Sequence, residues 1–206
     1  METKDYLRYV VEEIHRTIVA TVDDEGLPVT AAIDMMDYDD HSLYFLTAKG
    51  KNFYDRLSKR KYLAFTAMKG EDTLSSVAVS IRGKVREVGS TKLSDLFQKN
   101  PYMEKIYPTE KSREALTVFR IYEGSGEWFD LSKRPIERAS FTFGDPSFKE
   151  KGFFITDACI GCGQCTEVCP QNCICSDSVP MVIEQTHCLH CGNCLAICPI
   201  HAIERR

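Results

Sequence analysis

The stretches that decide the fold are CIGCGQCTEVCP, at Cys159–Pro170, and CLHCGNCLAICP, at Cys188–Pro199. Both have the pattern C-x2-C-x2-C-x3-C-P, and the second follows the first at an offset of 29 residues. Other positions repeat at the same offset, since Gly163 matches Gly192. The C-terminal part of the chain is therefore an internal repeat built around two runs of four cysteines.

This pattern is the signature of the two-cluster bacterial ferredoxins, and residues 150–206 resemble them throughout. Each [4Fe–4S] cluster needs four thiolates; a loop with two-residue gaps supplies three, and the fourth comes from the other repeat. Pro170 and Pro199 turn the chain after the crossing ligand, because proline fixes φ and donates no N–H. The resemblance predicts one ligand set of Cys159, Cys162, Cys165 and Cys198, and a second set of Cys188, Cys191, Cys194 and Cys169.

Two other uses of these cysteines are disfavoured. The ten cysteines all lie between residues 159 and 198, and the start of the chain at Met1–Asp5 has no apolar leader segment. We therefore expect a reducing compartment, where disulfides are rare. Structural zinc sites use two C-x2-C pairs far apart, which differs from a four-cysteine run occurring twice.

Two cysteines and two histidines lie outside this ligand scheme. Cys173 aligns with Ala202 of the second repeat and is interpreted as a small buried residue behind a cluster. Cys175 aligns with Glu204, a surface position. A redox-sensing role for these two thiols stays open as the alternative. His187 and His190 flank the second motif and are interpreted as loop residues, since cysteines already fill every ligand position.

Length, composition and charge limit the class of protein. The chain has 206 residues, a formal net charge of −4 and a pI of about 5.8. A nucleic-acid-binding protein is usually basic, so no nucleic acid is expected as partner. No apolar stretch of about 18 residues occurs, so no membrane-spanning helix is expected. The expected location is the cytoplasm of a host that is anaerobic.

The first part of the chain lacks cysteine and is long enough to bury its own core. Its hydrophobic periodicity predicts short strands with small helices between them. Strands are expected over 17–22, 28–35, 42–47, 62–68, 76–88, 116–122 and 127–131, with a hairpin turn at 123–126 and helices over 5–15, 51–58 and 91–100. The predicted fold class is mainly β (α+β): a split β-barrel at 1–131, a connector at 132–150 with a short strand at 139–143, and a ferredoxin-type domain at 151–206.

The order of these elements resembles the FMN-binding split barrels that are similar to pyridoxamine 5′-phosphate oxidase. The resemblance covers about residues 8–130. It rests on the order and spacing of four segments, which are Ile18–Pro28, Leu43–Thr47, Lys49–Lys51 and Val79–Lys84. It implies FMN as cofactor and a homodimer with the flavin at the subunit interface.

The residues that follow the strand at 42–47 suit an anionic ligand. Thr47 ends that strand, and Lys49, Lys51 and Asn52 stand where a helix begins, so hydroxyl, amine and helix N–H groups could bind the FMN phosphate. The alternative is a solvated loop. The resemblance adds a strand that passes the flavin ring, although some family members have arginine at the position of Ala31. The expected cofactor-binding residues are Thr30, Ala31, Ala32, Ile33, Leu46, Thr47, Lys49, Lys51 and Asn52.

These features together predict a redox protein with FMN and two [4Fe–4S] clusters. A flavin handles two electrons and a cluster passes one at a time. The expected function is an FMN-dependent reductase that passes electrons between its clusters and FMN and reduces a small-molecule acceptor, with a redox protein or NAD(P)H as donor. The alternative is an electron-transfer or redox-sensing protein without a small substrate. No catalytic residue is assigned.

Overall fold

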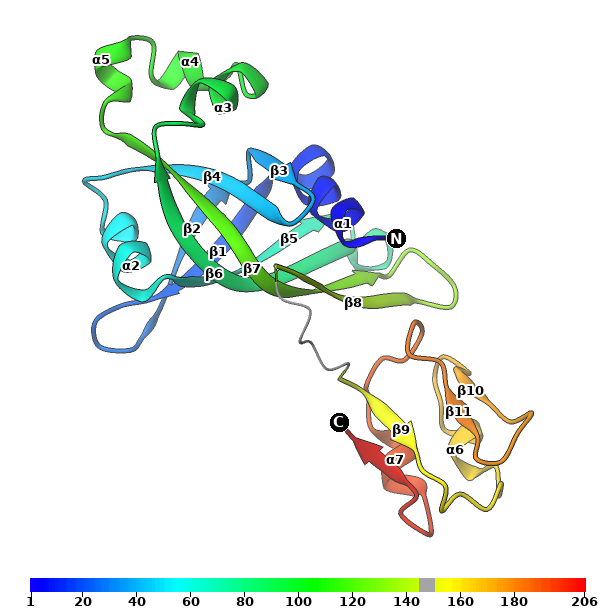
Figure 1. The fold of residues 1–206 in the computed structure, drawn as a ribbon. Coiled ribbons are helices and arrows are strands. Elements are labelled where there is room, and N and C mark those ends of the chain that lie inside the picture. The colour runs from blue at the N-terminus through cyan, green and yellow to red at the C-terminus, as the bar shows by residue number, and fades with distance from the viewer. Residues whose placement is uncertain (145–150) are drawn as a thin grey trace.

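The computed structural model describes residues 1–144 and 151–206, which form two parts called here the barrel and the cysteine-rich domain (Figure 1). Residues 145–150, the end of the predicted connector, lie outside the described residues. The strands of the barrel are β1 (Arg16–Val22), β2 (Pro28–Asp34), β3 (Asp37–Asp39), β4 (Ser42–Ala48), β5 (Tyr62–Lys69), β6 (Val77–Gly89), β7 (Leu116–Asp130) and β8 (Glu137–Phe143). Its helices are α1 (Thr3–Tyr9), a π-helical turn η1 (Val10–Ile14), α2 (Asn52–Arg60), a 3-10 turn η2 (Thr73–Ser75), α3 (Leu93–Lys99), α4 (Met103–Ile106) and α5 (Glu110–Arg113).

The eight strands form one antiparallel sheet in the order β2-β1-β5-β6-β7-β4-β3, with β8 paired to β7. The two ends of the sheet meet because β2 leads after two residues into β3, and the backbone N–H of Met36 between them donates to the carbonyl of Tyr44 on β4 at 2.8 Å. The sheet therefore curls into a barrel. This confirms the predicted mainly β fold.

Alternating side chains fill the barrel, as expected for strands that bury one face. Val19 of β1 is fully buried, whereas its neighbour Ile18 is exposed. The rings of Phe45 and Phe119 stack at the centre, 5.8 Å apart. Helix α2 covers one end of the barrel, and its buried residue Leu57 packs into this core.

The hairpin expected at 123–126 is absent, because β7 runs without a break from Leu116 to Asp130. The glycines serve close packing instead of a turn. A Cβ on Gly126 would lie 2.3 Å from the ring of Phe141, its cross-strand neighbour on β8. A Cβ on Gly124 would lie 2.4 Å from the carbonyl of Arg82 on β6. Glycine at these two positions therefore lets β7 pack closely against β6 and against Phe141 of β8.

The barrel also extends further along the chain than residue 131. The strand expected over 139–143 is present as β8, which begins at Glu137. It pairs with β7 from Glu137↔Asp130 to Phe143↔Gly124. Phe141 and Phe143 of this strand are buried in the barrel core. Residues 137–143 of the predicted connector are thus part of the sheet.

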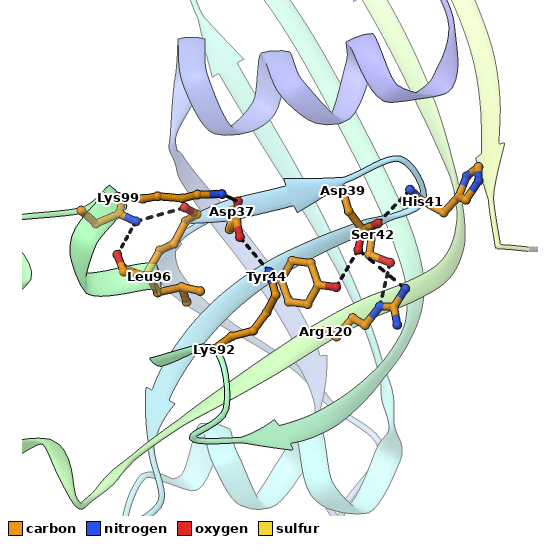
Figure 2. Close-up of polar contacts among 11 residues, drawn as sticks. Asp37, Asp39, His41, Ser42, Tyr44, Lys92, Leu96, Lys99 and Arg120 are labelled. Atoms are coloured by element: carbon orange, nitrogen blue, oxygen red, sulfur yellow. Dashed lines mark hydrogen bonds and ion pairs between the residues drawn. The ribbon is translucent and has the colours of Figure 1, made fainter. Parts of the chain in front are cut away.

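Helices α3, α4 and α5 lie between β6 and β7 and cover the outside of β4 with a second apolar cluster (Figure 1). Asp37 anchors this layer. Its buried carboxylate accepts hydrogen bonds from Lys99 and, at 3.0 Å, from Lys92 (Figure 2). Burial acts to raise the pKa of Asp37, but the two lysines outweigh it and hold that pKa below its ordinary value. The side-chain amide of Asn100 donates to the carbonyl of Met36 at 3.0 Å and fixes the end of α3.

A second polar group lies beside this anchor on the β3–β4 hairpin. The hydroxyl of Tyr44 donates to the Asp39 carboxylate at 2.6 Å, and Arg120 donates to Ser42 at 2.8 Å (Figure 2). Burial, together with the bond to Asp39, raises the pKa of Tyr44 to about 12. The tyrosine therefore stays protonated and acts as a fixed donor that holds the hairpin.

The cysteine-rich domain contains β9 (Phe153–Ile155), α6 (Gln164–Glu167), β10 (Ile174–Cys175), β11 (Val182–Ile183), α7 (Asn193–Ile197) and β12 (Ile203–Arg205). Strand β9 pairs with β12, and β10 pairs with β11. Helices α6 and α7 begin at equivalent positions of the two repeats. No helix in the described parts of the chain is both long and apolar enough to cross a membrane.

Candidate functional site

Cysteines line two cavities in the cysteine-rich domain, four in one and five in the other. Cys159, Cys162, Cys165 and Cys198 line the first, which we call the Cys159 cavity. Cys169, Cys188, Cys191 and Cys194 line the second, which we call the Cys188 cavity, and Cys173 is a fifth cysteine in its wall. The structure thus brings together the cysteines of each predicted set, three from one repeat and one from the other. Apolar side chains such as Ile155, Met181 and Ile183 complete the walls.

Glycines shape the loops that carry three cysteines each. Gly163 precedes α6 with φ of 79°, and Gly192 precedes α7 with φ of 82°. This left-handed conformation is strained for residues with a Cβ. The left-handed glycine changes the direction of the backbone, so the cysteines before and after it line the same cavity.

The spacing of the cysteine sulfurs in these cavities suits an iron–sulfur cluster better than a single metal ion. Among the described residues, no three His, Cys, Asp or Glu side chains are grouped tightly enough to hold one metal ion. A cube of four irons and four sulfides holds its four thiolates further apart than one zinc ion does. Backbone N–H groups also donate to the sulfurs, from Gly161 to Cys159 at 3.4 Å and from Ala202 to Cys198 at 3.3 Å. Such bonds favour thiolate ligands.

The two remaining cysteines differ in environment. Cys173 is buried, and its Sγ lies 3.5 Å from that of Cys169. Burial, followed by the neighbouring Cys169, raises the pKa of the Cys173 thiol, so it stays protonated. Ala202, its equivalent in the other repeat, is likewise buried. Cys175 is exposed on β10. The burial of Cys173 agrees with its interpretation as a small packing residue.

The barrel holds a candidate anion site where β4 leads into α2. Lys49, Lys51 and Asn52 are exposed there, and α2 begins without a side-chain cap. Neither lysine takes part in an ion pair between described residues. The hydroxyl of Thr47 is buried and has no hydrogen-bond partner among the described residues. An unpaired buried hydroxyl costs about 1–3 kcal/mol, so a bound phosphate would satisfy groups that the fold leaves open.

The remaining predicted flavin residues divide between two faces. Ala31 and Ile33 of β2 pack against the barrel core, whereas Thr30 and Ala32 point outward and are exposed. Leu46 packs against the cluster beneath α3 and α4. The structure therefore leaves only the outer positions of β2 and the β4–α2 turn accessible to a ligand through their side chains.

A hollow of about 460 Å³ lies on the outer face of the sheet, beside β2. Ile18 and Ala20 line it, and they pair with Ala32 and Thr30 of β2. Its other lining residues on β5, β6 and β7 are mostly small or polar, and Lys151 stands at its border. The hollow is large enough for part of a flavin or for side chains of a second subunit.

Asp34, at the end of β2, belongs to a polar chain that the sequence did not reveal. The hydroxyl of Tyr102 donates to Asp34 at 2.7 Å, so it accepts from His15 Nε2, which lies at 2.9 Å. Burial and the bond to Asp34 raise the pKa of Tyr102. The three residues come from β2, the start of α4 and the end of η1, so only the tertiary fold joins them.

Hydrogen bonds fix the cysteine-rich domain to strand β8. The N–H of Ile136 donates to the side chain of Gln171 at 2.8 Å, and its carbonyl accepts from His187 Nδ1 at 2.9 Å. The N–H of Arg138 donates to the carbonyl of Thr186 at 2.7 Å. Gln171 lines the Cys188 cavity, and Thr186 and His187 directly precede Cys188. Sequence analysis missed this junction.

Comparison with known proteins identifies both parts. A model of the pyridoxamine 5′-phosphate oxidase family matches residues 3–124, more than half of the chain. The chain belongs to this family. A 4Fe-4S dicluster domain matches residues 158–203. The pyridoxamine 5′-phosphate oxidase family supplies FMN binding, and the dicluster domain supplies two [4Fe–4S] clusters, so the cofactors are FMN and two [4Fe–4S] clusters.

Solved structures share the fold of the pyridoxamine 5′-phosphate oxidase family. A NimC/NimA family protein from Clostridium acetobutylicum is 13% identical, with a TM-score of 0.55, over 68% of this chain and 91% of that chain. A protein from the same organism related to general stress protein 26 is 16% identical, with a TM-score of 0.51, over 67% and 94%. A heme-binding protein from Mycobacterium smegmatis is 13% identical, with a TM-score of 0.52, over 66% and 56%. A search among curated proteins gives no match.

These matches establish a flavin-binding domain followed by a ferredoxin domain. That pairing makes the chain a redox or electron-transfer protein. Family members are commonly dimeric.

Proposed function

We propose that the chain is an FMN-dependent reductase that receives or delivers electrons through its own ferredoxin domain. The observation that carries this proposal is the junction between the two parts. Ile136 and Arg138 of the barrel are hydrogen-bonded to Gln171, which lines the Cys188 cavity, and to Thr186 and His187, which directly precede Cys188. A domain fixed in this way keeps a constant distance between cofactors, which favours electron transfer within one chain.

Each group of residues has a defined part in this proposal. The cysteines of the Cys159 and Cys188 cavities hold one [4Fe–4S] cluster each. Lys49, Lys51 and the first N–H groups of α2 bind the phosphate of FMN, with Thr47 beneath them. The outer positions of β2 lie along the flavin. Bound FMN exchanges two electrons with a small acceptor, whereas each cluster passes single electrons.

We also propose a homodimer. Ile18 and Met68 are 56% and 67% exposed, respectively, and they stand on the outer face that carries the hollow. A second copy on this face would cover these side chains and enclose the flavin. Light scattering after size exclusion tests this. A monomer that retains its flavin would contradict the shared site.

The first test is analysis of iron, sulfide and flavin in protein purified without oxygen. About eight irons, eight sulfides and one FMN per chain are expected. The reduced protein is then mixed with small quinones and nitroaromatic compounds, and flavin reoxidation is followed by absorbance. Reoxidation by at least one of them supports a reductase. Exchange with protein carriers alone would favour the electron-transfer alternative.

One neighbouring structure is a heme-binding protein, so the same absorbance spectrum separates two ligand classes. We expect flavin bands in addition to the broad absorption of the clusters. A Soret band with no extractable FMN would overturn the flavin assignment and leave the ferredoxin domain as the only redox part of the proposal.

A further inference from the structure

The two cysteine repeats are related by sequence, but their surroundings differ at equivalent positions. Ile160 of the first repeat corresponds to Leu189 of the second. Ile160 is 66% exposed, whereas Leu189 is half-buried. The residue after each Cys-Pro pair differs as well, being Gln171 in the first repeat and Ile200 in the second. The symmetry of the repeat is therefore broken at the protein surface.

The Cys188 cavity faces the barrel. Its wall includes Gln171, whose side chain accepts from the N–H of Ile136. Thr186 and His187, just before Cys188, make the other two hydrogen bonds, to Arg138 and Ile136, respectively. Within the described residues, all three hydrogen bonds between the barrel and the cysteine-rich domain thus end beside this cavity. We call it the inner cavity.

The Cys159 cavity faces solvent through an apolar rim formed by Ile160, Val179 and Ile200. Ile160 and Ile200 line the cavity and are 66% and 39% exposed, respectively. Val179 is 61% exposed and covers the same loop, since a Cβ on Gly161 would lie 2.8 Å from its methyl group. Three exposed aliphatic side chains around a cofactor cavity are typical of a contact surface. We call this the outer cavity.

Charge is also divided along the domain. The basic residues Lys151, Arg205 and Arg206 lie at the end where β12 pairs with Phe153, which lines the inner cavity, and they outnumber Glu204, which forms an ion pair with Arg206 there. Asp157 and Asp177 are exposed and lie within three residues of Ile160 and Val179 in sequence. An oxidised cluster with four thiolates adds about two negative charges. The outer end is therefore acidic and complements a basic partner.

We infer that the apolar rim of Ile160, Val179 and Ile200 is the docking site of a basic one-electron carrier protein, and that electrons pass from it through the outer cavity to the inner cavity and then to the barrel. This inference rests on the proposed function. Each docking event oxidises the partner by one electron and reduces the chain by one electron. Two such events, with a proton from water, reduce the flavin by two electrons. The path is reversible, so an oxidised partner, such as a protein with a ferric heme, takes one electron from the chain each time it docks.

The test uses the fully loaded protein and cytochrome c, a basic one-electron carrier, as the probe. Binding is measured by surface plasmon resonance, and the reduction of ferric cytochrome c by the reduced protein is followed by stopped flow. Ile160→Lys and Val179→Lys place a positive charge in the rim. Leu74→Lys adds the same charge at an exposed leucine of the barrel, 63% exposed, and is the matched control.

Both rim variants are expected to weaken binding and slow cytochrome c reduction by about tenfold. In Val179→Lys, whose side chain lines neither cavity, iron content and internal flavin reduction are expected to stay unchanged. Leu74→Lys is expected to behave like the unmodified protein. Wild-type affinity in both rim variants would overturn the docking site. An equal loss of affinity in Leu74→Lys would show that the effect comes from the net charge of the protein, and this would also overturn the docking site.

The order in which electrons pass through the two cavities is tested by a variant at the inner cavity. Gln171→Ala is expected to slow flavin reduction within the chain and to leave the cytochrome c rate unchanged. If Gln171→Ala slows cytochrome c reduction and Val179→Lys slows the internal step, the order is reversed and the inference is wrong. If reduced clusters never reduce the flavin in any variant, the proposed function fails, while the binding result still decides the docking site.

Discussion

The side chain of Gln171 accepts a hydrogen bond of 2.8 Å from the backbone N–H of Ile136. This bond joins the residue after a cysteine–proline pair to the residue that directly precedes strand β8 of the barrel. Removing it by Gln171→Ala is expected to slow electron transfer between cluster and flavin severalfold, because the junction loosens. Stopped-flow flavin absorbance measures this. Gln98→Ala, at an exposed glutamine of α3, is the control, and an equal slowing there would contradict the role of the junction.

The ligand assignment predicts how iron depends on each cysteine. Cys165→Ala and Cys169→Ala act on different cavities, so each is expected to lose about half of the iron. Cys175→Ala removes an exposed thiol that lines neither cavity and is expected to keep all of it. Iron and sulfide analysis decides, and a full complement of iron in Cys165→Ala would refute the assignment.

The phosphate site predicts a difference between two flavins. Lys51→Ala is expected to weaken FMN binding about tenfold, which corresponds to about 1.4 kcal/mol, because a cation at the start of α2 is lost. Riboflavin lacks the phosphate, so its affinity is expected to stay unchanged. Fluorescence titration of flavin-free protein measures both. Lys59→Ala, near the opposite end of α2, serves as the control. An equal loss of affinity for FMN and riboflavin would contradict a contact between Lys51 and the phosphate.

Most of the barrel and both cysteine sets follow from local patterns. The strands at β1, β4, β5 and β6 and helix α2 have clear periodicity, and the cysteine spacing is specific. Long-range contacts could not be predicted in the same way. The glycines at 124 and 126 have the local signature of a turn, but residues on neighbouring strands, Arg82 for Gly124 and Phe141 for Gly126, explain why glycine is needed there. The Gln171–Ile136 bond likewise joins residues with no shared pattern.

The glycine interpretation leads to a stability test. Gly126→Ala is expected to lower the free energy of unfolding by about 1–3 kcal/mol, because the new methyl group would meet the ring of Phe141. At Gly50 a Cβ has no atom within 4 Å, so Gly50→Ala is expected to be nearly neutral. Chemical denaturation compares the two. Equal stabilities would show that Phe141 moves aside without cost.

The buried Asp37 predicts a pH dependence. Its pKa is lowered in the folded state, so its contribution is present above the unfolded pKa of about 3.9 and is lost as the pH falls through the lower folded value. Asp37→Asn is expected to cost about 2 kcal/mol at pH 7, since two lysine bonds weaken. The difference between the two proteins should shrink below about pH 4. A constant difference down to pH 2 would contradict this reasoning.

The measurement that tests the central claim most directly is the rate of flavin reduction after the clusters are reduced by a light flash, at several protein concentrations. The account predicts a first-order rate that does not depend on protein concentration, because cluster and flavin belong to one assembly joined at Ile136 and Gln171. A rate proportional to concentration, or a flavin that stays oxidised while the clusters are reduced, would contradict it.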